Sequence, residues 1–323
     1  GGKGTPKVSP LPAAAGDDNS SFGVLQFNIL ADHLCMSGKH DNVEEEYRVW
    51  SYRFPLIMDN IAKFMRKSGV SVVCLQEVTP SHFQMFQQHK YFSGFQGYYH
   101  QNGKPTLGEY LGNATFVSRS TFHVPSNPII ISYADELKKL WKKSRNMKHY
   151  TGNQQVAVVV PLTHRATGRR VIVANTHISA NFRHPDTQLA QVAVLTQKIE
   201  SMQRMSPADA VIIAGDFNSK PIGSDLTPGS AVYQLMTRGR VAANHPDCHP
   251  NMPSVPPLAL IQSNTLQHGM PLSSAYATWN GGGGGGGGEP AITNITGANG
   301  EHWPAFEGCL DYIFFDHQLL DLR

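Results

Sequence analysis

The sequence predicts a mixed α/β fold in which one β-sheet packs against another. Short apolar runs of strand length alternate along the chain with segments of helical periodicity. The apolar runs at 156–162 and 171–175 follow each other across a Thr-Gly turn with no helix between them, which is typical of antiparallel pairing. With 323 residues, of which 40% are apolar, the chain can bury a sizeable core.

The strands are predicted from apolar runs and from alternation. Residues 24–30 alternate, which places Leu25, Phe27 and Ile29 on one face. Further strands are expected at 72–75, 114–117, 156–162, 171–175, 211–214 and 310–315. Most of these runs are continuously apolar, as strands covered on both faces are.

Two helices are predicted from apolar residues at helical spacing. The first pattern runs from Trp50 to Phe64, and Pro55 lies inside it, so we expect this helix to begin near the proline or to kink there. The second covers 186–203, and Pro185 or Asp186 suits its first turn. Its inward residues are predicted to be Leu189, Val192, Ala193, Thr196, Ile199 and Met202.

Two segments have compositions that are unsuited to packing. Residues 1–21 are rich in Gly, Pro, Ala and Ser, and we expect a disordered leader. Residues 281–288 are all glycine, which is costly to order, and we expect a flexible insertion rather than a linker between domains. Residues 22–323 are therefore expected to form one domain.

Composition excludes some classes of protein. No apolar run approaches eighteen residues, so no membrane span is expected. The net charge of +3 permits a polyanionic partner but does not argue for one. The four cysteines, Cys35, Cys74, Cys248 and Cys309, form no Cys-x-x-Cys pair, which argues against a cysteine zinc site and a dense disulfide framework. We expect a reducing compartment, the cytoplasm, with the nucleus left open.

Polar side chains follow the predicted strands at the points where these end. One by one, such residues are more often turn formers than functional groups. Six of them in this order favour a shared site, and oxygen ligands of this kind suit Mg²⁺. The six are Asn28, Glu77, His177, Asp216, Asn218 and Asp311.

This ordered set of motifs resembles the endonuclease/exonuclease/phosphatase superfamily over residues 22–323. The resemblance implies a four-layer α/β/β/α sandwich of two mixed, mostly antiparallel sheets flanked by helices. It also implies that Asn28 and Glu77 bind one or two Mg²⁺ ions, and that His177 contacts the scissile phosphate.

The other matched residues carry further implied roles. Asp216 in Gly-Asp-Phe-Asn would align the nucleophilic water, and Asn218 would help to bind the phosphate. Asp311 in Asp-Tyr-Ile would orient a catalytic histidine, because a carboxylate fixes the imidazole tautomer and stabilises its protonated form. In the family this histidine belongs to a later Ser-Asp-His element, and we expect it to lie beyond Arg323.

Within the superfamily, several segments resemble the carbon-catabolite-repression-type deadenylases. These are the Thr-His…Pro-Asp-x-x-Leu-x-Gln pattern ending at Gln191, the segment 269–277, and the Thr-Asn-x-Thr and Phe-x-Gly-x-Leu-Asp-Tyr motifs after residue 292. The resemblance implies an Mg²⁺-dependent 3′→5′ exoribonuclease that removes AMP from poly(A) tails, and a larger deadenylase complex as partner. Phe306 and Phe182 would stack on adenine, and Asn113 would contact substrate.

Other functions stay open at this stage. A related enzyme could cleave 2′,5′-linked oligoadenylate or remove the 2′-phosphate of a nicotinamide dinucleotide, as nocturnin-like proteins do. A catalytically inactive RNA-binding or scaffold module is the alternative from another class. The deadenylase-like segments favour the exoribonuclease.

Overall fold

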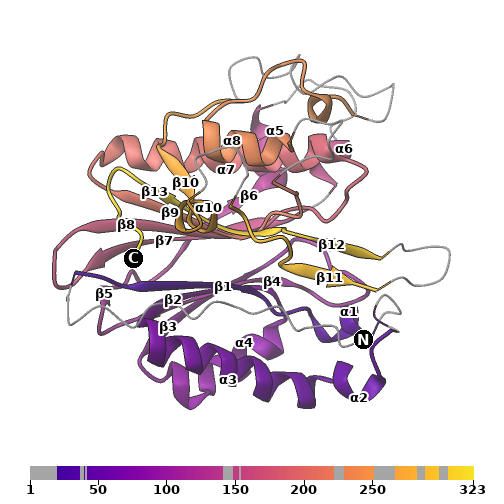
Figure 1. Ribbon diagram of the computed structural model, residues 1–323, viewed down its shortest axis with the longest axis vertical. Coiled ribbons are helices and arrows are strands. Elements are labelled where there is room, and N and C mark those ends of the chain that lie inside the picture. The colour runs from indigo at the N-terminus through magenta and orange to yellow at the C-terminus, as the bar shows by residue number, and fades with distance from the viewer. Residues whose placement is uncertain are drawn as a thin grey trace.

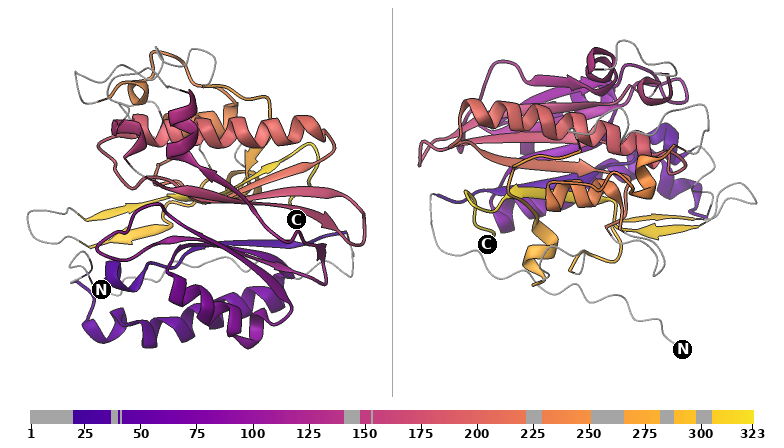
Figure 2. Two further views of the ribbon diagram at one scale, coloured as in Figure 1. Left: turned by 180° about the vertical axis from the view of Figure 1, so that it is seen from behind. Right: turned by 90° about the horizontal axis from the view of Figure 1, so that it is seen from above.

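Two β-sheets lie face to face, and helices cover the outer side of each (Figures 1 and 2). The computed structural model describes residues 20–36, 40, 42–140, 148–152, 154–221, 229–250, 266–281, 288–297 and 305–323. The layers therefore follow the order α/β/β/α, which confirms the predicted fold class. Most of the expected leader and of the glycine insertion, residues 1–19 and 282–287, falls outside the described residues.

The smaller sheet has four strands in the order β1-β2-β4-β3. β1 runs parallel to β2, and the other two pairs are antiparallel. The strands are β1 (Gly23–Asn28), β2 (Val70–Val78), β3 (Phe95–Gln101) and β4 (Gly112–Ser118). The helices of this half of the molecule are α1 (Asp32–Cys35), α2 (Glu45–Arg48), α3 (Trp50–Ser68) and α4 (Pro80–Gln88), followed by the 3₁₀ helix η1 (Lys90–Phe92).

The larger sheet has seven strands in the order β10-β13-β9-β8-β7-β5, with β6 also paired to β7. β8 and β9 are parallel, whereas the remaining pairs are antiparallel. The strands are β5 (Phe122–His123), β6 (Ile129–Ser132), β7 (Val156–His164), β8 (Arg170–His177), β9 (Ala210–Asp216), β10 (Leu272–Ser274) and β13 (Asp311–Asp316).

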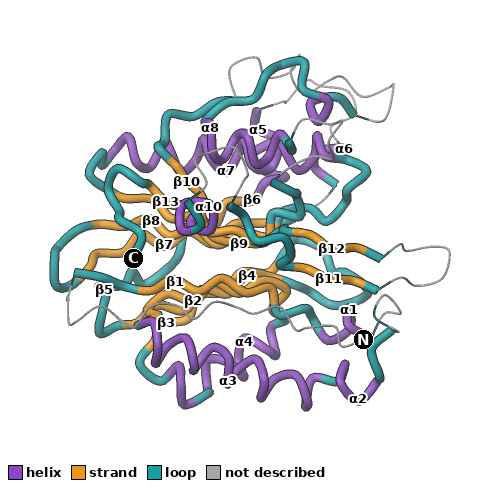
Figure 3. The backbone as a smooth tube through the Cα atoms, in the orientation of Figure 1, coloured by secondary structure: helices purple, strands orange, loops and turns teal. Residues whose placement is uncertain are grey.

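Helices cover the outer face of this sheet, and a short ribbon projects beside it (Figures 1 and 3). The helices are α5 (Tyr133–Leu140), α6 (Lys148–Thr151), α7 (Pro185–Met205) and α8 (Ala231–Arg238). The ribbon pairs β11 (Asn294–Thr296) with β12 (Phe306–Gly308). The short helices η2 (Pro246–Cys248) and α10 (Ala275–Trp279) complete the described elements.

The strands predicted from apolar runs are all present, and the β7–β8 pair is antiparallel as predicted. The first predicted helix, α3, begins at Trp50 rather than near Pro55. Pro55 is therefore the sixth residue of the helix, where its lack of an N–H removes the intrahelical hydrogen bond to the carbonyl oxygen of Ser51. No described helix is both long enough and apolar enough to cross a bilayer.

Three apolar clusters match the three spaces between the layers. Side chains of β2, β7 and β8, such as Val72, Val158 and Val173, fill the space between the sheets. A second cluster packs α7 on the outer face of the larger sheet, and a third packs α3 and α4 on the smaller one. The sheets are thus held as rigid neighbours, which fixes the strand ends relative to one another.

Buried amide side chains connect the two sheets across this apolar layer. Gln26 Nε2 on β1 donates to Gln76 Oε1 on β2 at 2.7 Å, and Gln76 Nε2 donates to Asn175 Oδ1 on β8 at 2.7 Å. Asn175 Nδ2 in turn donates to the carbonyl oxygens of Leu75 and Ala114, at 3.2 and 2.9 Å. We call Gln26, Gln76 and Asn175 the inter-sheet amide network. Its geometry sets the register of one sheet on the other, because buried amides that lose their partners are costly.

Replacing Asn175 with alanine is expected to lower the free energy of unfolding by about 3 kcal/mol, because several buried partners lose their hydrogen bonds. Urea denaturation would measure the change. Asn60→Ala, at an exposed position on α3, is the matched control and should change the stability little. Equal stabilities of the two variants would show that the network does not join the sheets.

Candidate active site

The six polar residues predicted at strand ends gather at one edge of the sandwich. The pairing of β9 with both of its neighbours places His177 and Asp311 opposite Asp216 in the larger sheet. Asn28, from the smaller sheet, bridges the gap: its Nδ2 donates to Glu77 Oε1 at 3.0 Å and to Asp216 Oδ2 at 2.9 Å. Asn28 and Asp216, which are 188 positions apart in sequence, therefore share one site.

Glu77 owes its position to an irregularity in β2. Its φ angle is 59°, in the left-handed region, and the pairing of β2 with β4 shifts register between Leu75 and Val78. For a non-glycine residue such a conformation costs about 1–3 kcal/mol, and it persists only where the surroundings impose it. The backbone N–H of Ala31 donates to Glu77 Oε2 at 3.0 Å and holds the carboxylate in place.

The loop after β1 is fixed from two sides. Asn28 Oδ1 accepts a hydrogen bond from the N–H of Leu30 at 2.9 Å, and Leu30 itself has a φ of 53°. The guanidinium of Arg53 on α3 donates to the carbonyl oxygen of Ile29 at 2.5 Å and also to that of Leu30. Arg53 thus positions the segment that carries Asn28. Sequence reasoning missed Arg53, because an arginine on an amphipathic helix is usually an exposed surface residue with no special role.

The Gly-Asp-Phe-Asn turn positions Asp216 and Asn218. A Cβ at Gly215 would lie 2.0 Å from the carbonyl oxygen of Thr176, so glycine is needed for β9 to approach β8 this closely. After the strand, the N–H of Asn218 donates to Asp216 Oδ1 at 2.8 Å, and Asn218 adopts a left-handed φ of 49°.

The imidazole of His177 is neutral and accepts a hydrogen bond at Nε2. Asn218 Nδ2 lies 3.0 Å from His177 Nε2 and donates to the carbonyl oxygen of Ile178 at 2.9 Å. An amide nitrogen can only donate, so the network assigns the imidazole proton to Nδ1. Burial lowers the pKa of His177, against the opposing effect of the Glu77 and Asp311 carboxylates. The neutral form is therefore the one that this site favours near neutral pH.

Asp311 is oriented by two donors. Thr293 Oγ1 donates to Asp311 Oδ2 at 2.7 Å, and Gln26 Nε2 donates to Asp311 Oδ1 at 2.8 Å. The same threonine oxygen accepts the N–H of Leu310 at 2.9 Å, which fixes the threonine as well. Gln26 belongs to the inter-sheet amide network, so the contact between the sheets and the site is one connected structure.

The site carries an excess of negative charge. Burial raises the pKa of Asp216 to about 7, and burial together with the neighbouring Asp216 charge raises the pKa of Asp311 to about 7. Among the described residues, neither of these carboxylates nor that of Glu77 forms an ion pair with lysine or arginine. A divalent cation would supply the missing positive charge, and the amide and carboxylate oxygens present are the donors that Mg²⁺ prefers.

Asn28 and Glu77 are the two residues predicted to hold the metal. They are in hydrogen-bond contact with each other, and Glu77 is held in a strained backbone conformation. Asn28 turns its Nδ2 towards the carboxylates of Glu77 and Asp216, while its Oδ1 accepts the N–H of Leu30. An ion held here would therefore require the Asn28 amide to turn its oxygen towards the carboxylates, and the assignment of both residues as ligands stays a prediction.

The predicted substrate contacts lie in two places. Phe182, after β8, and Phe306, on β12, stack with ring centroids 5.6 Å apart and ring planes 24° apart, and Phe182 is 55% exposed. Asn113 instead points into the protein: its Nδ2 donates to the carbonyl oxygen of Val156 at 2.8 Å, and its buried Oδ1 has no hydrogen-bond partner. Asn113 therefore lies between the sheets, and its expected substrate contact stays a prediction.

Sequence reasoning also missed Lys220. Its ammonium nitrogen lies over the ring of Phe306, 4.8 Å from the centroid, which is within the range of a cation–π interaction. The residue follows the Gly-Asp-Phe-Asn turn, so a lysine shortly after this motif was the available signal. It adds a positive charge beside the aromatic pair.

Asp311→Asn is expected to stabilise the metal-free protein more at pH 8 than at pH 5. The folded-state pKa of about 7 exceeds the ordinary 3.8, so the folded protein binds this proton more tightly than the unfolded chain does. Stability contributed by Asp311 is therefore present at low pH and is lost as pH rises towards 7. The asparagine side chain does not ionise, so the variant does not lose this stability as the pH rises. Urea unfolding in EDTA would measure it, and a variant effect that is independent of pH would contradict it.

Comparison with known proteins agrees with the fold. The model of the Endonuclease/Exonuclease/phosphatase family matches residues 25–323. A protein of Coccidioides immitis named CCR4-Not complex 3′-5′-exoribonuclease subunit Ccr4 is 24% identical over 370 residues, with 96% of this chain and 43% of that protein covered. Carbon catabolite repressor protein 4 homolog 1 of Arabidopsis thaliana is 28% identical over 336 residues, covering 94% of this chain and 52% of its own length.

Solved structures share the architecture. ANGEL2, described as a 2′,3′-cyclic phosphatase, superimposes with a TM-score of 0.68 at 23% identity, covering 92% of this chain and 84% of its own. The human nocturnin catalytic domain gives a TM-score of 0.58 at 22% identity, with 91% and 82% covered. At these identities the structures establish the fold alone.

The chain spans 43% and 52% of the lengths of the two curated relatives described above, so their complete activities do not transfer to it directly. The family match, by contrast, covers nearly the whole chain. This chain therefore belongs to the endonuclease/exonuclease/phosphatase family, whose members are typically metal-dependent phosphoesterases, and it is a distant relative of the Ccr4 deadenylases.

Proposed function

We propose that this protein is an Mg²⁺-dependent 3′→5′ exoribonuclease that removes AMP from poly(A) tails. The observation that carries the proposal is the stacked Phe182–Phe306 pair in the same molecule as a phosphoesterase-type cluster of acidic and amide side chains. The names of the fungal and plant relatives point in the same direction. Because the fungal relative is a CCR4-Not subunit, assembly into a larger deadenylase complex belongs to the proposal.

The chemistry would be in-line attack of water on the phosphodiester. Asn28 and Glu77 would hold the metal, which would supply Lewis acidity towards the phosphate oxygens. Asn218 would turn its amide protons towards the phosphate, and the neutral His177 would donate through its ring N–H. Burial raises the pKa of Asp216 to about 7, which suits a carboxylate that accepts a proton from the attacking water near neutral pH.

Asp311 would act through a histidine. Its two oxygens are already held by Thr293 and Gln26, so the carboxylate is fixed before any partner arrives. A carboxylate fixed in this way can orient an imidazole and stabilise its protonated form. The oriented imidazole and Asp216 would share the proton transfers, as the family resemblance implies.

The aromatic pair would bind an adenine base. Two rings that enclose a base must lie about 7 Å apart, twice the ordinary contact distance of about 3.5 Å between stacked atoms. The observed separation of 5.6 Å leaves no room for this, so a base would stack on an outer face or the exposed Phe182 would swing away to admit it. Lys220, over the Phe306 ring, would meet the phosphate that accompanies the base.

The proposal predicts AMP release from 5′-labelled oligo(A) in Mg²⁺ by the full natural protein, and loss of that release in Glu77→Ala. The assay would compare oligo(A) with oligo(C), 2′,5′-oligoadenylate, a 2′-phosphorylated nicotinamide dinucleotide and a 2′,3′-cyclic phosphate end. Glu45→Ala, at an exposed position on α2, is the matched control and should remain active. Equal or faster turnover of any other substrate would refute the poly(A) assignment, and no turnover of any substrate would favour an RNA-binding module.

Phe182→Ala is expected to raise KM for oligo(A) by roughly 5- to 150-fold with little change in kcat, since stacking on a base contributes about 1–3 kcal/mol. Steady-state kinetics would separate the two constants. Met205→Ala removes another apolar side chain, 79% exposed at the end of α7, and should leave both constants unchanged. An unaltered KM in Phe182→Ala would show that Phe182 does not stack on the base.

A further inference from the structure

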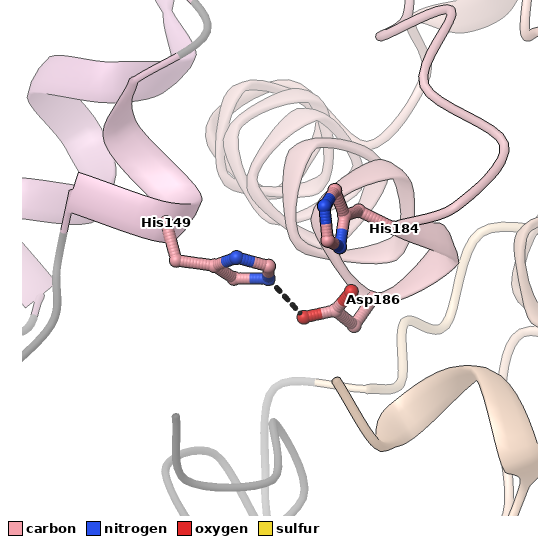
Figure 4. A group of neighbouring side chains, drawn as sticks. All are labelled: His149, His184 and Asp186. Atoms are coloured by element: carbon pink, nitrogen blue, oxygen red, sulfur yellow. Dashed lines mark hydrogen bonds and ion pairs between the residues drawn. The ribbon is translucent and has the colours of Figure 1, made fainter. Parts of the chain in front are cut away.

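Two histidines and an aspartate meet where α6 faces the start of α7 (Figure 4). His149 comes from α6, His184 is the residue before α7, and Asp186 lies in the first turn of α7. One ligand atom of each residue lies within 4.8 Å of those of the other two. His149 Nε2 and Asp186 Oδ2 are 2.6 Å apart, and the two imidazole rings meet edge to face with centroids 4.8 Å apart.

The polar groups of this cluster are buried and incompletely satisfied. Asp186 is fully buried, and within the described part of the chain its Oδ1 has no hydrogen-bond partner. The buried Nδ1 of His184 has none either. Burial raises the pKa of the Tyr150 hydroxyl, and the charge of the same carboxylate and a hydrogen bond to it raise that pKa further. A buried carboxylate oxygen and a buried ring nitrogen left without partners call for a ligand that satisfies both.

We propose that His149, His184 and Asp186 form a Zn²⁺-binding site. Two imidazoles and a carboxylate are zinc ligands, with bonds of about 2.0–2.2 Å, and a water completes the tetrahedron. Such bonds place the ligand atoms about 3.3 Å apart. The 2.6 Å contact between His149 and Asp186 would therefore open by less than about 1 Å, while His184 would draw closer. The ion would replace the proton now shared by the pair.

This site differs in chemistry and place from the Asn28–Glu77 site. Nitrogen donors favour zinc over magnesium, whereas the amide and carboxylate oxygens of the other site favour magnesium. The two sites are nevertheless connected. Gln188, two residues after Asp186, donates to the carbonyl oxygens of Ser179 and Asn218 at 2.8 and 2.9 Å. A zinc ion would join α6 to α7 and anchor the 179–184 segment that carries Phe182.

The competing explanation is a His149–Asp186 ion pair with no metal. The two explanations differ in what His184 does. In the ion pair His184 is a bystander, because its contact with His149 is only an edge-to-face ring contact. In the zinc site it is a ligand. His184→Ala is therefore the informative change, since it leaves the His149–Asp186 pair, and with it the metal-free fold, in place.

The test is calorimetric titration of Zn²⁺ into protein that has been stripped with a chelator and returned to excess Mg²⁺. We expect one Zn²⁺ per chain in the wild type and an increase in its melting temperature. His184→Ala should weaken binding by more than about 100-fold, beyond the 10- to 100-fold that loss of a supporting group causes. His184→Cys, which restores a zinc ligand, should regain most of the affinity. Co²⁺ in place of Zn²⁺ should give the visible spectrum of a tetrahedral site.

Two controls separate this site from the rest of the molecule. Glu77→Ala disables the other site and should keep full Zn²⁺ binding, so a failure of the proposed nuclease activity leaves this inference standing. His123→Ala removes an exposed histidine and should also bind normally. Unchanged affinity in His184→Ala, or loss of Zn²⁺ binding in Glu77→Ala, would overturn the proposal.

Discussion

The structure depends on one constraint: three carboxylates lie close together, and no lysine or arginine of the described residues forms an ion pair with them. Glu77, Asp216 and Asp311 lie where the two sheets meet, and the groups that face them are neutral amides, hydroxyls and backbone N–H groups. Those donors hold the carboxylates in place without neutralising them. Burial, with a smaller contribution from the neighbouring carboxylate charges, raises the pKa of each of the two aspartates to about 7. A divalent cation would offset both costs, so an arrangement that lowers the stability of the metal-free protein would favour metal binding.

The layers of the fold make this arrangement possible. Strand pairing brings the site residues together. Asp216 at the end of β9 lies opposite both His177 and Asp311, and Asn28 at the end of β1 reaches Asp216 from the other sheet. The inter-sheet amide network then fixes how far apart the two edges lie, because Gln26 contacts both Gln76 and Asp311. Movement of one sheet against the other would break the network and the site together. Stability and chemistry therefore rely on the same side chains.

Much of the fold and of the candidate site could be predicted from the sequence, because the signals lie in residues that are neighbours along the chain. A polar residue that ends an apolar strand is visible in the sequence, so the strands β1 and β9 and the positions of Asn28 and Asp216 at their ends could be predicted. What the sequence hides is contact between distant segments. The role of Arg53 becomes visible only in the fold, where α3 packs beside the loop after β1. The left-handed backbone conformation of Glu77 could not be predicted either, because no glycine or turn motif marks it in the sequence. The sequence also does not reveal that Asn113 turns inwards from its strand, and its expected contact with substrate stays a prediction.

We propose that Asn28 and Glu77 hold a hard divalent cation beside Asp216. The most direct measurement is the anomalous difference density of crystals soaked in Mn²⁺, which binds the same oxygen ligands as Mg²⁺. The account predicts a strong peak within coordination distance of the Glu77 carboxylate and the Asn28 amide oxygen. Manganese bound elsewhere, with the three carboxylates still facing only amides and hydroxyls, would contradict it.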